Sequence, residues 1–232
     1  MSPHAPTIVL IHGAWHGGWS WQRFTPHLER RGFPFRCVEL PSVGAKPGHA
    51  VDLTADAAAV TAVLDDIRRP AILCGHSYGG MVISHAAVGR SNVARLVYIC
   101  AFMPNDGESL ESIGGGKRAP WIRALDGDLT LPDLDQTATV FYGDCDTATQ
   151  QWATRQLRPQ SGAPFAQPVP RPAWRTIPST YVVCTNDMAI PAKVQRGTFA
   201  PRATDVVELE ASHSPFLSKP AELADIVIAA AK

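Results

Sequence analysis

The chain has 232 residues, of which 45% are hydrophobic and 18% charged, so it can build one globular domain over residues 1–232. Its 21 basic residues equal its 21 acidic residues, and this balance gives no electrostatic reason to expect a nucleic acid or an anionic membrane as partner. The chain start resembles neither a signal peptide nor a transmembrane helix, and the single cysteines predict buried, reduced thiols in a cytoplasmic protein without a metal site.

Short apolar runs recur along the chain and predict strands. Most are continuous and rich in β-branched residues, which is typical of strands that are buried on both faces of a parallel sheet. In chain order they are TIVLIHG from Thr7, FRCVEL from Phe35, AILCGHS from Ala71, ARLVYICA from Ala94, TYVVCT from Thr180 and DVVELE from Asp205. Cys37, Cys74, Cys100 and Cys184 lie within these runs, which is why we expect their thiols to be buried.

Helical patterns lie between the strands. In TADAAAVTAVLDDI the apolar residues follow helical spacing, with Thr54 as the expected N-cap. GGMVISHAAVG follows the third run, and SKPAELADIVIAAAK closes the chain with Pro220 in the first turn of a helix. Because strands and helices alternate, the predicted class is α/β with a mostly parallel sheet.

Residues 101–178 interrupt this alternation. The segment is rich in proline and contains the irregular stretch RPQSGAPFAQPVPRP beside one helical piece, DTATQQWATRQL. A long excursion between two core strands is usually a lid or a binding element, so we expect an inserted cap here.

The stretch GHSYGG, from Gly75 to Gly80, matches the G-x-S-x-G pattern of a nucleophile. It follows a predicted buried strand and opens a helix of small residues, which is the context that this motif requires. The sharp turn needs glycine at positions 75 and 79 and would raise the Ser77 hydroxyl above the sheet. Ser77 is therefore the predicted nucleophile.

A serine nucleophile needs donors for the oxyanion that forms on its substrate. The N–H of Tyr78, the residue after the nucleophile, is one expected donor. The loop IHGAWHGGW follows the first strand, and Ala14 is the expected second donor. His12 and His16 are interpreted as structural residues that fix this loop through hydrogen bonds.

The serine also needs a base, and the base needs an acid that orients it. Asp187 comes just after the fifth apolar run, and His213 just after the sixth. Carboxyl ends of parallel strands meet at one edge of a sheet, so these residues could meet Ser77 there. Asp106, one strand earlier, remains the competing acid.

With these residues identified, the chain resembles the α/β-hydrolases, and within them the plant methylesterase and hydroxynitrile lyase family and its bacterial relatives. The motifs HGAWHGGWSW, GHSYGGMV, TNDMAIP and ASHSPFLSKP carry the resemblance, whereas the cap matches weakly. The resemblance implies a six-stranded, mostly parallel sheet flanked by helices, with an inserted cap. It also implies the chain order Ser77, Asp187, His213 for the triad.

Two departures from the family favour an esterase over a lyase. Lyases of this family commonly have a lysine after the histidine, and they have threonine or asparagine at the position of Gly13. Here Ser214 brings no cation, and Gly13 brings no side chain. Both positions are expected to face the substrate.

The predicted function is hydrolysis of a small carboxylic ester without a cofactor. Aromatic residues of the cap are expected to contact an apolar part of that ester; they are Phe102, Trp121, Phe141, Tyr142 and Trp174. Two alternatives stay open: a lyase or biosynthetic tailoring reaction at the same serine, and a ligand-binding protein that turns over slowly. The oligomeric state is also open, with a homodimer as one option.

Overall fold

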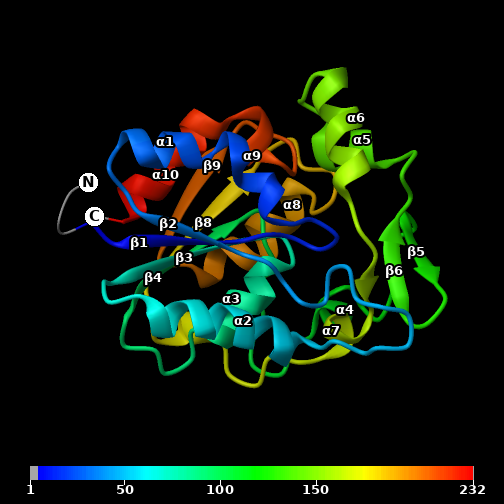
Figure 1. The fold of residues 1–232 in the computed structure, drawn as a ribbon, viewed down its shortest axis with the longest axis horizontal. Coiled ribbons are helices and arrows are strands. Elements are labelled where there is room, and N and C mark those ends of the chain that lie inside the picture. The colour runs from blue at the N-terminus through cyan, green and yellow to red at the C-terminus, as the bar shows by residue number, and fades with distance from the viewer. Residues whose placement is uncertain (1–4, 232) are drawn as a thin grey trace.

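The protein is described here by a computed structural model that covers residues 5–231, and its centre is a six-stranded sheet (Figure 1). Every neighbouring pair of strands is parallel, and the order across the sheet is β2-β1-β3-β4-β8-β9. This confirms the expected six-stranded parallel sheet. The strands are β1 (Thr7–Ile11), β2 (Phe35–Val38), β3 (Ala71–His76), β4 (Val93–Ile99), β8 (Ser179–Cys184) and β9 (Asp205–Leu209).

The central strands are buried as their sequences predict. Every residue of β1, β3 and β8 is buried, and these strands carry continuous apolar runs. The strands at the two edges, β2 and β9, are largely exposed. Cys37 lies in β2 and is exposed, so the expectation that its thiol is buried is wrong; Cys74, Cys100 and Cys184 are buried as expected.

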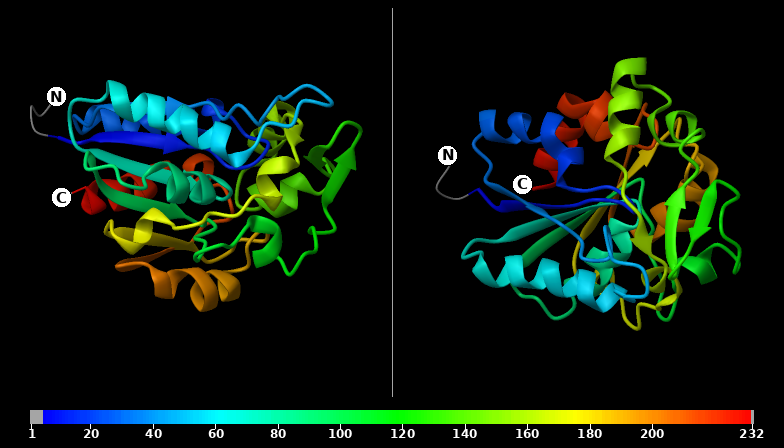
Figure 2. Two further views of the ribbon diagram at one scale, coloured as in Figure 1. Left: turned by 90° about the horizontal axis from the view of Figure 1, so that it is seen from below. Right: turned by 45° about the vertical axis from the view of Figure 1, so that its right-hand side comes forward.

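Helices cover both faces of the sheet (Figures 1 and 2). One face carries α1 (Thr25–Arg30), α9 (Pro215–Ser218) and α10 (Pro220–Ala230), and the other carries α2 (Leu53–Asp66) and α3 (Gly79–Ala86). The predicted N-cap of α2 is wrong. Asp52 caps this helix, because its side chain accepts a hydrogen bond from the N–H of Ala55 at 2.9 Å.

Short helical turns complete the fold. A 3₁₀ turn, η1 (Gly18–Arg23), follows β1. After β8 come α8 (Ala192–Val194), the π-helical turn η3 (Gln195–Phe199) and the 3₁₀ turn η4 (Ala200–Arg202). None of the helices within residues 5–231 is long and apolar enough to cross a membrane.

The chain between β4 and β8, which was predicted as a cap, forms a separate group of short elements at the carboxyl ends of the core strands (Figures 1 and 2). Its three strands pair antiparallel in the order β5-β6-β7. The elements are α4 (Leu110–Ile113), β5 (Ile122–Leu125), β6 (Leu129–Pro132), α5 (Thr137–Tyr142), α6 (Thr147–Gln156), β7 (Gln160–Ser161), α7 (Ala163–Ala166) and η2 (Ala173–Arg175).

Candidate active site

Ser77 sits in a strained turn between β3 and α3. Its φ is +52°, a region that side chains other than glycine rarely adopt. The turn also needs its two glycines: a Cβ at Gly75 would lie 2.6 Å from the carbonyl oxygen of Gly79, and one at Gly79 would lie 2.7 Å from that of Ile11. The sequence therefore dictates a turn that holds the serine at the end of a buried strand.

His213 and Asp187 form a buried pair. Nδ1 of His213 donates to Oδ2 of Asp187 at 2.7 Å, and both residues are buried in loops that follow β9 and β8. Since Nδ1 carries the proton, Nε2 of the neutral ring is left as a proton acceptor. Oδ1 of Asp187 accepts the N–H groups of Ala189 and Ile190 at 2.7 and 2.9 Å, which fix the carboxylate in its loop.

Asp106, the competing acid, lies elsewhere. It is exposed, and its carboxylate pairs with Nε of Arg175 at 3.3 Å. The structure therefore places Asp187, and not Asp106, on the histidine.

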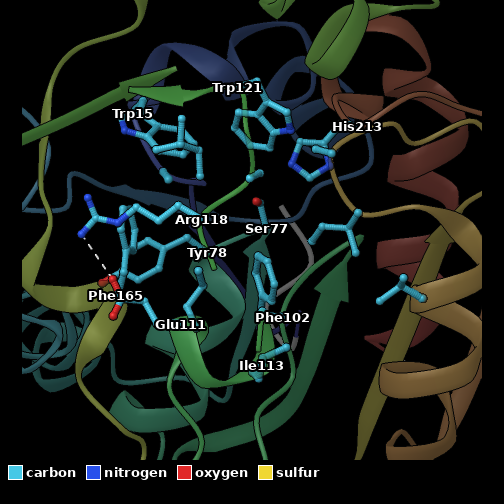
Figure 3. Close-up of a pocket in the computed structure, with 18 of the residues that line it drawn as sticks. Trp15, Ser77, Tyr78, Phe102, Glu111, Ile113, Arg118, Trp121, Phe165 and His213 are labelled. Carbon is cyan, nitrogen blue, oxygen red and sulfur yellow. Dashed lines mark hydrogen bonds and ion pairs between the residues drawn. The ribbon is translucent and has the colours of Figure 1, made fainter. Parts of the chain in front are cut away.

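Ser77 and His213 line the same cavity, which has a volume of about 320 Å³ (Figure 3). In the described part of the chain no hydrogen bond joins the Ser77 hydroxyl to His213. Catalytic hydrogen bonds are often long without substrate and tighten when it binds. The geometry thus joins Asp187 to His213 and places Ser77 in the same cavity as His213.

Ala14 and Tyr78, the expected oxyanion donors, also line this cavity. Within residues 5–231 neither of their main-chain N–H groups is used in a hydrogen bond, so both can serve a bound oxygen. Tyr78 directly precedes the first turn of α3, whose N-terminus adds a favourable field for negative charge.

The remaining cavity wall is mainly apolar. Of the predicted cap aromatics, Phe102, Trp121 and Phe141 line it. Trp15, Phe165 and Phe199 also line it, although the sequence analysis did not assign them to the site. Trp15 carried a signal, since it directly follows Ala14 in the loop after β1, whereas nothing in the local sequence singles out the two phenylalanines.

Charged side chains line the cavity on one side, from the segment that contains α4. They are Glu111, Lys117 and Arg118, and Nη2 of Arg118 pairs with Oε1 of Glu111 at 3.3 Å (Figure 3).

Three residues predicted to contact substrate lie outside the cavity lining: Gly13, Tyr142 and Ser214. A Cβ at Gly13 would lie 2.7 Å from Nδ1 of His76, so glycine is needed there for packing. The hydroxyl of Ser214 is buried and has no hydrogen-bond partner within the described residues.

Tyr142 contacts the loop after β1 and does not line the cavity. Its hydroxyl donates to Nε2 of His16 at 2.9 Å, and Nδ1 of His16 donates to the carbonyl of Ala14 at 2.7 Å. Trp174 is likewise held away from the cavity, because its Nε1 donates to the carbonyl of Pro104 at 2.7 Å.

His12 and His16 bind main-chain groups of the same loop, as the sequence analysis interpreted them. Nδ1 of His12 donates to the carbonyl of Gly13 at 2.9 Å, and its Nε2 accepts the N–H of Leu40, beyond β2, at 3.1 Å. Burial lowers the pKa of His12 to about 4 and that of His16 to about 3, so both rings are neutral around pH 7. Both nitrogens of each ring are used in hydrogen bonds, so the two rings fix the loop, although His16 also lines the cavity.

The buried carboxylate of Asp56 belongs to a hydrogen-bond network that links β7 to the Ser77–Tyr78 turn and to the loop after β1. Oδ2 of Asp56 accepts from the hydroxyls of Tyr78 and Ser42 at 2.7 and 2.6 Å. Desolvation raises the pKa of Asp56, and the hydrogen bonds from Ser42 and Tyr78 oppose that shift. Gln160 in β7 donates to Ser42 at 2.9 Å and accepts the N–H of Trp15 at 2.9 Å. No local sequence pattern indicates this network, because Gln160 lies 118 residues from Ser42 and 145 residues from Trp15.

One group of side chains within residues 5–231 has the spacing of metal ligands: His76, Cys100 and His213, whose ligand atoms lie within 4.8 Å of one another. One nitrogen of each histidine already has another role, whereas Nδ1 of His76 is buried without a partner in the described structure. His213 uses Nδ1 on Asp187, and His76 uses Nε2 on the carbonyl of His213. Burial also raises the pKa of the Cys100 thiol well above its usual value, which disfavours the thiolate that binds metals.

Comparison with known proteins gives a consistent result. Residues 8–226 match the Alpha/beta hydrolase family. The chain is 31% identical to the pyrethroid hydrolase of Sphingobium wenxiniae, covering 95% of this chain and 85% of that protein, and 24% identical to methylesterase 7 of Arabidopsis thaliana, covering 95% and 94%. A crystal structure of a pyrethroid hydrolase from Sphingobium faniae JZ-2 superposes with a TM-score of 0.83 at 28% identity, covering 97% of both chains.

Proposed function

Because the chain belongs to the alpha/beta hydrolase family, we propose that it is a serine esterase that cleaves a small carboxylic ester through an acyl-enzyme intermediate. The observation that carries this proposal is the hydrogen bond of 2.7 Å between buried Asp187 and His213, which lines the same cavity as Ser77. Relatives that are named hydrolases and esterases support ester hydrolysis as the reaction class.

The first half-reaction forms the acyl-enzyme. Oγ of Ser77 attacks the ester carbonyl carbon while Nε2 of His213 takes the hydroxyl proton. The carbonyl oxygen becomes an oxyanion that accepts hydrogen bonds from the N–H groups of Ala14 and Tyr78. The C–O bond to the alcohol then breaks, and the alcohol leaves with the proton from His213.

The second half-reaction releases the acid. His213 takes a proton from water, and the hydroxide attacks the acyl carbon. The bond to Ser77 breaks, and the serine recovers the proton from His213. Throughout, Asp187 keeps the imidazole in the tautomer that leaves Nε2 free, and it stabilises the imidazolium ion that forms in each half-reaction.

The cavity supports a substrate with a flat apolar group. Trp15, Trp121 and Phe141 pack against one another, with ring centroids 5.2 to 6.2 Å apart. Such packing fixes the rings before a ligand binds, so binding of an aryl group loses little free energy to their reorganisation. We propose an ester in which such a group lies against this aromatic wall.

The lyase alternative has less support from the cavity. Lyases of this family commonly have a lysine directly after the histidine. The lysine and arginine that line the cavity here, Lys117 and Arg118, follow α4 and do not lie in the loop that carries His213. Product analysis separates the reactions: hydrolysis of a short aryl ester should exceed release of benzaldehyde from mandelonitrile by orders of magnitude. Strong cyanohydrin cleavage beside weak ester hydrolysis would overturn the esterase proposal.

A panel of methyl and aryl esters with acyl groups of increasing length tests the proposal and the substrate class together. We expect turnover of at least one aryl ester, with an initial burst of alcohol equal to the enzyme concentration if release of the acyl group is slow. Turnover that is absent across the panel would instead favour the slow ligand-binding alternative.

A further inference from the structure

We infer that Gln195 is a positioning residue of the active site, which acts by holding the carboxylate of Asp187. This inference rests on the proposed function, because it assigns a role within the same triad. Gln195 is the first residue of the π-helical turn η3, which follows α8, and it is fully buried. Single π-helical turns are rare and often occur at functional sites.

The side-chain amide of Gln195 joins the acid to the end of its own strand. Nε2 donates to Oδ2 of Asp187 at 3.0 Å and to the carbonyl of Ile190 at 2.6 Å. Oε1 accepts the N–H of Cys184, the last residue of β8, at 3.1 Å. All of these groups are buried, where a hydrogen bond to a charged partner is worth more than one at the surface.

The partners of the amide determine which way it points. A flipped amide would place its carbonyl oxygen against the carboxylate of Asp187 and its NH₂ group against the N–H of Cys184. Both contacts would be repulsive, so the network allows only the orientation that donates to Asp187. Gln195 therefore serves the acid as a fixed donor.

Gln195 and His213 share one oxygen of the acid. Oδ2 of Asp187 accepts from Nδ1 of His213 and from Nε2 of Gln195, while Oδ1 is held by the N–H groups of Ala189 and Ile190. Without Gln195 the carboxylate keeps the donors on Oδ1 but loses the second donor on Oδ2. Rotation about its Cα–Cβ and Cβ–Cγ bonds would then be less restricted, and the imidazole would be less well aligned with Ser77.

Two substitutions separate positioning from simple packing. Gln195→Met keeps the volume and removes the donor, and Gln195→Glu keeps an acceptor for Cys184 but turns an oxygen toward Asp187. At alkaline pH, where the introduced carboxyl is ionised, it repels Asp187. We therefore expect Gln195→Glu to be more damaging to turnover than Gln195→Met, whereas a purely structural role predicts that turnover falls only as far as the folded fraction falls in each variant.

For Gln195→Met we expect kcat to fall roughly ten- to hundredfold, as for loss of one hydrogen bond to a charged group, with KM within about threefold. The matched control is Gln150→Met, since that amide donates only to the carbonyls of Tyr142 and Cys145 and should leave kcat within about twofold. A double-mutant cycle completes the design: in an Asp187→Asn background, Gln195→Met should cost much less than in the wild type.

The rate at which a fluorophosphonate labels Ser77 serves as the common readout, because it reports activation of the serine without knowledge of the natural ester. Slower labelling of Gln195→Met than of wild type, together with non-additivity in the cycle, is the expected result. Equal labelling rates, or equal losses in both backgrounds, would overturn the role of Gln195 and leave the esterase intact. Absence of labelling in the wild type would overturn the esterase proposal itself, and this inference with it.

Discussion

Nε2 of His76 donates a hydrogen bond to the main-chain carbonyl of His213 at 2.8 Å, so the residue before the proposed nucleophile holds the backbone of the proposed base. The two imidazole rings lie 4.6 Å apart between centroids, and both are buried. Because β3 carries one of these histidines and the loop after β9 carries the other, this bond ties together two distant segments at the site.

Replacing His76 with phenylalanine should weaken the coupling between these segments. The aromatic volume is largely kept, but the carbonyl of His213 then retains only the thiol of Cys100, at 3.4 Å, as a donor. We expect His76→Phe to lower kcat by about two- to tenfold, the loss that corresponds to one ordinary hydrogen bond, with little change in KM. Steady-state kinetics on an aryl ester would measure this, and an unchanged kcat would show that the bond has no role in turnover.

The two candidate acids can be compared directly. Asp187→Asn should lower kcat by orders of magnitude, because an amide at this position favours the wrong tautomer of His213. Asp106→Asn should leave kcat within about twofold, since Asp106 is exposed and pairs with Arg175, and such surface pairs contribute little. A large loss of kcat in Asp106→Asn, together with an active Asp187→Asn variant, would mean that Asp106 and not Asp187 orients His213.

Ser214 offers a test at the position after the base. Its hydroxyl is buried without a partner in the described structure, and burying an unpaired hydroxyl disfavours folding by roughly 1–3 kcal/mol. Ser214→Ala should therefore leave ester hydrolysis within about an order of magnitude and should not lower the free energy of unfolding. A kinetic assay would measure the rate of ester hydrolysis, and urea denaturation would measure the free energy of unfolding. A large loss of activity would indicate a catalytic role for Ser214 that the geometry does not suggest.

The neutral, buried histidines predict how stability depends on pH. Burial lowers the pKa of His12 to about 4 and that of His16 to about 3, from 6.5 in the unfolded chain. Between pH 6.5 and about 4 the unfolded state thus binds protons that the native state does not, so stability falls as pH falls through this window, by about 1.4 kcal/mol per pH unit for each histidine.

Urea unfolding at pH 7 and at pH 5 measures this dependence. We expect a smaller free energy of unfolding at pH 5, and His16→Gln, which removes one of these rings, should reduce the difference. A free energy of unfolding that stays constant or rises toward pH 5 would contradict the burial of neutral rings at this site.

The sequence was sufficient to predict the sheet and the places of Ser77, Asp187 and His213 in it, because each depends on local patterns; their catalytic roles stay a prediction. Continuous apolar runs predicted the parallel strands, and Ser77, Asp187 and His213 each follow the end of such a run. The carboxyl ends of parallel strands share one edge, so the chain order alone brought the three residues together.

The contacts that complete the site depend on tertiary structure and could not be predicted in this way. Tyr142 was expected at the substrate, but the direction of its side chain depends on how α5 packs, and it turns toward His16. Gln195 lies in a π-helical turn that no sequence period indicates. Gln160 meets Ser42 across 118 residues of chain, beyond the reach of any local pattern, and Ser42 in turn donates to Asp56.

The most direct test of the central claim is to treat the protein with a fluorophosphonate and to map the modified residue by mass spectrometry, with turnover of an aryl ester measured on the same sample. The account predicts one modification, on Ser77, with loss of turnover in proportion to labelling, and neither labelling nor turnover in a folded Ser77→Ala variant. Labelling at another serine, or ester hydrolysis that persists in Ser77→Ala, would contradict it.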